Sequence, residues 1–209
     1  MATIAHAITT LDRVKSRINI ATAVTTHDTV LEGLIAAMTD WIENFCDRRF
    51  KETAYSNEVY DGGNLDGLRK KWLILKNCPV IGSLTAFSYM AGVPSTPYWT
   101  AFLRDDYDLN GDSGIIKLFS VLPNGFRNIR VSYTAGYKID FTAPTDPTKH
   151  TLPFDLSNVA ERLVIKEFKR RESVGKAQES LGDSSMTWRD GLEKEDLEVL
   201  ERYKRTIFV

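Results

Sequence analysis

Residues 30–46 read VLEGLIAAMTDWIENFC, and their apolar side chains recur at steps of three and four positions. This spacing predicts an amphipathic helix of about five turns with one broad apolar face. Thr25 or Thr26 is the expected cap at its start. Asp40 and Glu43 lie mostly off the apolar face. Since the stripe contains a tryptophan and other large side chains, we expect it to be buried against other helices. The stripe consists of Val30, Leu31, Leu34, Ile35, Met38, Trp41, Ile42, Phe45 and Cys46.

Further helices are predicted on both sides of this segment. A short helix should run from Thr9 to Ile18, with Thr9 as its cap. After a proline-containing linker at residues 139–152, Asp155 is the expected cap of a second long helix. The apolar stripe of that helix consists of Leu156, Val159, Ala160, Leu163, Val164 and Phe168.

The C-terminal residues predict one more helix. Asp190 followed by Glu193 is typical of a capping box, and we expect the helix to continue to about Arg205. Residues 180–190 are rich in Ser, Gly and Asp, which predicts a mobile loop before it.

Helical periodicity disappears between Phe50 and Tyr137, where short β-rich runs alternate with turn residues. The alternation is clearest from Asn128 to Tyr133. Asn110-Gly111 predicts a tight turn between two strands, with positive φ angles at both residues. Further strands are expected at 72–75, 83–90, 98–103, 107–109 and 115–119.

These segments predict an α+β fold, mainly a helical bundle of three to four helices with an inserted small antiparallel β-sheet. We expect a single domain over residues 1–209. Its parts would be a helical body at 1–49 and 153–175, an inserted β subdomain at 50–138, the linker at 139–152, and a C-terminal helix or arm at 190–209.

The composition excludes several classes of protein. An apolar fraction of 43% is sufficient for a real core, and the net charge of −1 argues against a dedicated nucleic-acid binder. No run approaches the roughly 18 apolar residues that a membrane helix needs, and the N-terminus does not resemble a secretory signal. Cys46 and Cys78 are expected to be reduced core residues. We therefore expect a soluble protein that is made in a cytoplasm.

The chain offers little evidence of chemistry. His6, His27 and His150 are its only histidines, and none belongs to a zinc-binding or hydrolase motif. Asp106 to Gly111 fits the first half of a calcium loop, but Lys117 stands where the loop needs a bidentate glutamate. A hairpin turn is the favoured interpretation, and a small hydrolase or calcium-dependent lectin-like module is the alternative. We expect no catalytic residue, cofactor or metal.

Several segments, taken in order, resemble the head–tail connector (adaptor) proteins of long-tailed bacteriophages. The order and spacing of the segments carry this resemblance, since each one alone is a common core or turn pattern. The linker between Tyr137 and Pro153 is longer than the family pattern leads us to expect. The segments are Cys46-Asp47-Arg48-Arg49-Phe50, Tyr60-Asp61-Gly62, Leu73 to Leu75, Pro79-Val80, Tyr107 to Ile116, Val131 to Tyr137, and Pro153-Phe154-Asp155-Leu156.

The resemblance implies a structural virion protein and not an enzyme. Such a protein forms a homo-oligomeric ring, commonly dodecameric, at the head–tail junction (neck). It docks beneath the portal protein, contacts a downstream head-closure or tail protein, and leaves a channel through which DNA passes without sequence-specific binding. The expected location is the virion, and the host cytoplasm during assembly, with no membrane contact. The alternatives are another neck or tail-completion protein (head closure or tail terminator), or a DNA-binding module of packaging or ejection.

Under this resemblance, the last helix, Leu192 to Val209, is the candidate for a portal-docking arm. Apolar residues near a chain end are unusual unless something covers them. The alternative is that they cover the subunit's own helical bundle. The candidate docking residues are Leu197, Leu200, Tyr203, Ile207, Phe208 and Val209.

Overall fold

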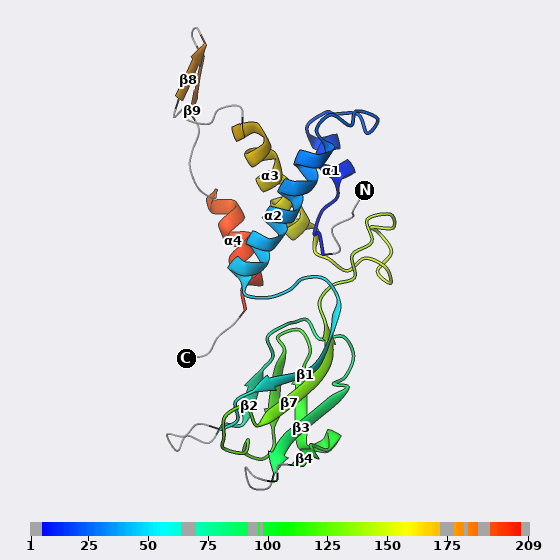
Figure 1. Cartoon of the computed structure of the whole chain (residues 1–209), viewed down its shortest axis with the longest axis vertical. Coiled ribbons are helices and arrows are strands. Elements are labelled where there is room, and N and C mark those ends of the chain that lie inside the picture. Colours follow the sequence, from blue (N-terminus) through cyan, green and yellow to red (C-terminus); the bar gives the residue numbers. More distant parts are fainter. Residues whose placement is uncertain are drawn as a thin grey trace. The chain divides into compact units, whose positions relative to one another are not determined.

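The computed structural model describes residues 6–63, 70–91, 96, 98–171, 178–181, 184–187 and 193–205. The chain divides into two compact units, Met1–Asp47 with Ile139–Lys204, and Arg48–Lys138 with Arg205–Val209. The four helices belong to the first unit and strands β1 to β7 to the second (Figure 1). The predicted α+β class is confirmed.

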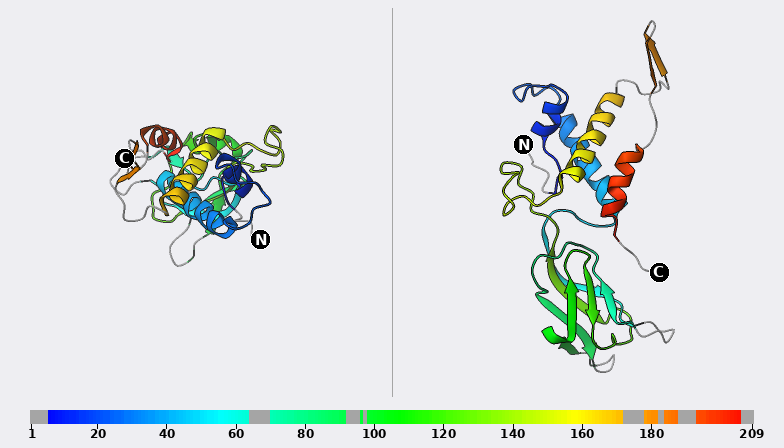
Figure 2. Two further views of the ribbon diagram at one scale, coloured as in Figure 1. Left: turned by 90° about the horizontal axis from the view of Figure 1, so that it is seen from above. Right: turned by 180° about the vertical axis from the view of Figure 1, so that it is seen from behind.

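The helical unit is built around two long helices, α2 (Asp28–Cys46) and α3 (Phe154–Arg170), which pack against each other. The short helices α1 (Leu11–Arg17) and α4 (Lys194–Tyr203) each contact both of them. Figure 2 shows α4 beside the C-terminal half of α2. Val14, Leu31, Ile35 and Val164 form a buried cluster that joins the first three helices.

Two short strands, β8 (Gln178–Leu181) and β9 (Ser184–Thr187), form an antiparallel pair between α3 and α4. The prediction of a mobile loop at residues 180–190 is therefore wrong for the paired residues. Polar composition alone does not exclude a strand, because backbone hydrogen bonds to a neighbouring strand stabilise a hairpin.

The helix starts differ from the predictions. Thr10, not Thr9, caps α1 by accepting a hydrogen bond from the N–H of Arg13. His27 occupies the N-cap of α2, and its side chain makes no capping hydrogen bond. Pro153 precedes α3, so that Asp155 lies inside its first turn. The predicted capping box of α4 is wrong, since Glu193 is the N-cap and makes no side-chain cap bond. Asp190 lies outside the described residues.

The apolar stripe of α2 is only partly buried. Leu31 and Ile42 are fully enclosed, but Val30 is 42% exposed and Trp41 is 39% exposed. Trp41 instead stacks on Phe45, with 5.5 Å between ring centroids. The predicted burial of the whole stripe is therefore wrong, because a broad stripe exceeds what the three neighbouring helices cover.

The β unit contains two antiparallel sheets. The first has the order β1 (Thr53–Tyr60), β7 (Ile129–Ala135), β3 (Ala86–Ala91) and β4 (Tyr98–Ala101). The second has the order β2 (Trp72–Ile74), β6 (Ile115–Leu118) and β5 (Tyr107–Asn110). A 3₁₀ turn, η1 (Arg104–Asp106), leads into β5.

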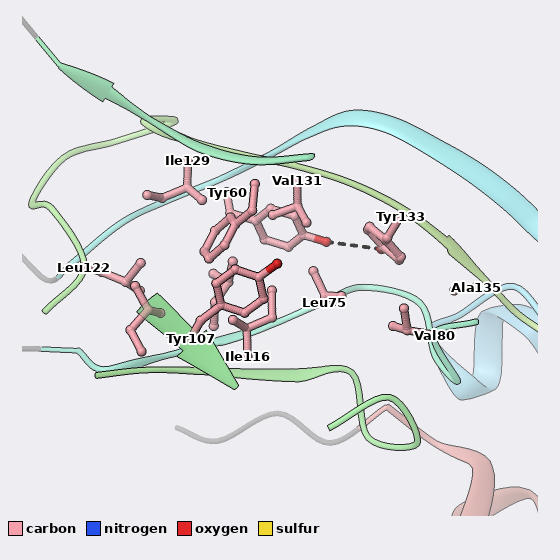
Figure 3. Packing of buried hydrophobic residues seen from close by; sticks show 13 residues of the cluster. Tyr60, Leu75, Val80, Tyr107, Ile116, Leu122, Ile129, Val131, Tyr133 and Ala135 are labelled. Carbon is pink, nitrogen blue, oxygen red and sulfur yellow. Dashed lines mark hydrogen bonds between the residues drawn. The ribbon is translucent and has the colours of Figure 1, made fainter. Parts of the chain in front are cut away.

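Both sheets contribute side chains to one core (Figure 3). Ile129, Val131 and Tyr133 of β7 are buried, while Arg130 and Ser132 are half-buried, so the alternation predicted for this strand is confirmed. The β5–β6 turn differs from its prediction. The residue of positive φ is Gly114 (φ 67), and neither Asn110 nor Gly111 has a positive φ.

Candidate interaction surfaces

The described part of the candidate docking arm is helix α4, which packs on its own bundle. Leu200 is fully buried, and its carbonyl oxygen lies 3.6 Å from the Sγ of Cys46. Leu197 and Tyr203 are half-buried. The remaining predicted docking residues, Ile207, Phe208 and Val209, lie outside the described residues. Leu200 thus serves the subunit's own core, and the docking role of the arm stays a prediction.

Polar contacts also hold α4 on the bundle. The phenol of Tyr203 donates to Oδ1 of Asp155 at 2.7 Å, and Arg202 donates to Oδ2 of the same carboxylate at 3.2 Å. Near the start of the helix, the guanidinium of Arg162 donates from Nε to the buried Asp196 at 2.8 Å. Apolar burial and these pairs together place α4 in a defined position on α3.

A buried carboxylate anchors α1 to α3. Glu161 is 1% exposed and accepts hydrogen bonds from Nε of Arg13 at 2.6 Å and from the hydroxyl of Thr9 at 3.1 Å. Arg17 pairs with its second oxygen. No pattern in the sequence reveals this cluster, because Glu161 lies more than 140 positions from Thr9, Arg13 and Arg17 along the chain.

A second buried pair fixes the start of α2. The ammonium group of Lys15, 1% exposed, lies 2.7 Å from Oδ1 of Asp28 and donates to the carbonyl of Thr22 at 3.0 Å. Burying a lysine is costly unless it is paired, and here both an anion and a carbonyl satisfy it. These contacts join α1 and the segment that follows it to the start of α2.

Two tyrosines and a glutamate form a polar network inside the β unit. The phenols of Tyr60 and Tyr133 both donate to Oε2 of Glu58, the second at 2.6 Å. The backbone N–H groups of Lys76 and Asn77 donate to these phenols at 3.0 and 3.3 Å. Figure 3 shows the hydroxyl of Tyr60 directed toward Tyr133.

Burial raises the pKa of Tyr60 and Tyr133 well above the ordinary range, and their hydrogen bonds to Glu58 raise it further. Both phenols are therefore neutral donors at physiological pH. An activated nucleophile or base needs the opposite shift, so this network fits a structural role.

A surface pocket of about 540 Å³ lies beside this network. Its lining consists of Val59, Tyr60, Asp61, Lys76 and Arg127. Asp61 accepts a hydrogen bond from the backbone N–H of Arg127 at 2.7 Å, and the ammonium group of Lys76 lies 3.7 Å from Glu58. The lining contains no histidine, cysteine or serine, and its two cations suit the binding of an anionic group.

One group of potential metal ligands was not anticipated. Nε2 of His6 lies 3.0 Å from Oδ1 of Asp40. One potential ligand atom from each of His6, Asp40 and Glu43 lies within 4.8 Å of the other two. The side chains are of the kinds that zinc accepts. The hydrogen bond between His6 and Asp40 accounts for their proximity without an ion.

The suspected calcium turn is part of a hairpin. The carboxylate of Asp106 accepts a hydrogen bond from the N–H of Leu103 at 2.6 Å. Asp108 lies in β5 opposite Lys117, which places a cation beside the expected ligands. The two cysteines are free and buried, as expected. Over the described ranges, no helix has the length and apolar character to span a membrane.

Comparison with known families matches residues 8–66 to the phage gp6-like head–tail connector protein family. The match covers α1, α2 and β1, and it confirms the resemblance that the sequence predicts. A search of curated proteins finds no match to this chain.

The solved structures that resemble this chain include subunits of gene transfer agent (GTA) particles. A chain in the neck of an empty GTA particle, computed with C6 symmetry, has a TM-score of 0.55 and 16% identity and covers 100% of this chain and 95% of its own length. A chain in the neck of the native GTA particle, computed with C12 symmetry, has a TM-score of 0.51 and 17% identity. The match covers 100% of this chain and 94% of that chain. A chain in the virion of the native particle has a TM-score of 0.50 and 16% identity. The match covers 95% of this chain and 88% of that chain. At these identities the likeness shows the fold.

Proposed function

We propose that this protein is a structural subunit of a ring at the head–tail junction (neck) of a tailed, phage-like particle. One observation carries the proposal. The chain matches a head–tail connector family at its N-terminal end and is similar in fold, over its whole length, to chains found in particle necks. A ring of twelve copies is compatible with both the C6 and the C12 symmetry of those necks, because a twelve-fold axis contains a six-fold axis.

The physical properties of the chain suit this role. The buried pairs at Glu161 and Lys15 rigidify the helical unit. Many copies of one modest contact can hold a ring firmly, because each further contact forms within an existing assembly. A net charge of −1 limits attraction to phosphates, so DNA can pass through a channel without being retained. No step of this role requires catalysis.

Within this ring, we assign the C-terminal arm at 190–209 to docking beneath the portal, and the β unit to contacts with neighbouring copies or the downstream component. The half-buried Leu197 and Tyr203 support this assignment for the arm, since each side chain is partly exposed to solvent. Electron micrographs of the purified protein, alone and mixed with a portal protein, test the proposal. Rings that cap the portal are expected, and a protein that neither forms rings nor binds the portal would contradict it.

The docking arm is best tested by a short truncation. Removing the whole of Leu192–Val209 would also remove the buried Leu200 and the partner of Arg162, and would therefore weaken the bundle. A chain that ends at Arg205 keeps these contacts. We expect it to unfold at the same temperature as the full chain and to lose portal binding in a pull-down. Glu198→Ala on the exposed side of α4 is the control and should bind normally. A truncated chain that binds the portal as tightly as the full chain would remove residues 206–209 from the docking surface.

A further inference from the structure

Three large apolar side chains of the β unit are exposed over about seven tenths of their surface. Leu103 is 69% exposed, Phe119 is 70% exposed and Phe126 is 71% exposed. Leu103 and Phe119 are both bonded to Asp106. The N–H of Leu103 donates to the carboxylate of Asp106 at 2.6 Å, and the N–H of Phe119 donates to the backbone carbonyl of Asp106 at 3.0 Å. Exposed apolar side chains on a rigid support are typical of contact surfaces.

An unpaired anion accompanies this apolar pair. Asp105, the central residue of η1, is exposed and makes no hydrogen bond or ion pair with any residue in the described ranges. We call Leu103, Asp105 and Phe119 the η1 knob.

The pocket beside Tyr60 offers complementary groups. Arg127 has a left-handed backbone (φ 50) that is fixed by the bond from its N–H to Asp61. Its guanidinium makes no ion pair within the described part of the chain. The ammonium group of Lys76 is only loosely paired with Glu58 and is half-exposed. Phe126 directly precedes Arg127 in the sequence. We call the pocket together with Phe126 the Arg127 pocket.

The knob and Lys76 of the pocket lie at opposite ends of the second sheet. The η1 turn leads into Tyr107, which pairs with Leu118 at the end of β6. Lys76 follows β2, whose last residue, Ile74, pairs with Ile115 at the start of β6. The knob of one copy therefore does not reach its own Lys76, and a contact between Asp105 and Lys76 joins two copies.

We propose that the η1 knob of one copy binds the Arg127 pocket of the next copy in the ring. The carboxylate of Asp105 pairs with the guanidinium of Arg127 and the ammonium of Lys76, while Leu103 and Phe119 pack against Phe126. The partner is a second copy of this chain, and the inference rests on the proposed ring. Two different faces meet in this contact, and such heterologous contacts close into rings when the rotation between copies divides a full turn.

Carbodiimide cross-linking tests this contact in the full-length protein. The reagent joins a carboxylate to a nearby amine by an amide bond with loss of water, so it can link Asp105 to Lys76 without any mutation. Equal amounts of ¹⁴N- and ¹⁵N-labelled protein are mixed before the reaction. We expect mass spectrometry to find an Asp105–Lys76 peptide in mixed-isotope form, which proves that the link joins two copies. Lys76→Arg keeps the charge but cannot form the amide, so this variant should form rings and lose the peptide.

Charge reversal gives an independent test. Asp105→Arg and Arg127→Asp should each weaken self-association about tenfold or more, since like charges then face each other. The two changes combined in one chain should restore it. An aspartate at position 127 tolerates the left-handed backbone better than most residues. Asp112→Arg, at another exposed aspartate of the same unit, is the matched control and should associate like the unchanged protein.

The outcomes separate this contact from the proposed function. Cross-linked oligomers whose mixed-isotope peptides exclude Asp105 and Lys76 would refute the contact and leave the ring proposal standing. If Asp105→Arg and Arg127→Asp each still form rings that bind the portal at full affinity, the contact is likewise refuted and the ring proposal stands. A protein that forms no oligomer, alone or with a portal, would overturn both.

Discussion

Replacing Glu161 by glutamine should destabilise the helical unit, because it removes a buried anion. The substitution keeps the size of the side chain and removes the anion that Arg13 and Arg17 share. Breaking a fully buried pair costs about 3–5 kcal/mol. The side chain of Arg13 is 29% exposed and that of Arg17 is 39% exposed, so water can solvate both cations in part. We therefore expect a loss of ~2–3 kcal/mol.

Urea unfolding followed by far-ultraviolet circular dichroism measures this loss, and hydrogen exchange in α1 locates it. Glu167→Gln is the control, because Glu167 lies on the same helix and forms a half-exposed pair with Arg170 at 3.8 Å. The control should cost less than about 0.5 kcal/mol. Equal losses in the two variants would mean that the buried carboxylate contributes no more than a surface one, and the reasoning would fail.

Four further predictions concern the β unit and two glycines. Tyr133→Phe removes a phenol that satisfies Glu58 and the N–H of Asn77, and should lower the free energy of unfolding by about 1–3 kcal/mol in a urea titration; an unchanged midpoint would contradict this. The pKa values of Tyr60 and Tyr133 are raised in the folded state. The stability that these residues contribute is therefore complete below their unfolded-state pKa of about 10 and is lost as pH rises above that value. Thermal unfolding between pH 9 and 11 should show this loss as a falling unfolding temperature. The fall with pH should be smaller in a double variant that carries both Tyr60→Phe and Tyr133→Phe. Gly136→Ala should destabilise the fold by about 1–3 kcal/mol, since φ is +110 and the new Cβ would lie 2.6 Å from the carbonyl oxygen of Lys51; Gly33→Ala in α2 meets no atom within 4 Å and should stabilise the helix by about 0.5–1 kcal/mol.

The sequence predicts elements best where one pattern is strong and local. The steps of three and four in α2, and the alternation at Ile129, Val131 and Tyr133, are confirmed because side-chain period follows directly from backbone geometry. Strand β1 was not predicted individually, since its sequence TAYSNEVY lacks a regular alternation. Its register shifts between Tyr55 and Glu58, and Asn57 there has a φ of 51, so the bulge itself disrupts the expected period.

Contacts between distant residues explain the remaining misses. Thr9 looked like a helix cap, but its hydroxyl instead donates to Glu161, which no local pattern reveals. Glu43 was expected off the apolar face of α2 and is 3% exposed. For the candidate docking surface, the stripe of α4 was visible in the sequence. Only the packing shows that Leu200 faces its own bundle while Leu197 and Tyr203 remain half-buried.

A ring amplifies small differences that a single subunit scarcely registers. An exposed ion pair such as the one proposed between Asp105 and Arg127 contributes about 0.5 kcal/mol. Over a twelve-membered ring the same loss at every contact reaches about 6 kcal/mol, which can decide whether the ring forms. Asp105→Arg should therefore leave the unfolding temperature of the isolated subunit unchanged while rings disappear from electron micrographs. A variant that unfolds at a lower temperature and still forms rings would show that Asp105 serves the fold of the β unit and not its assembly.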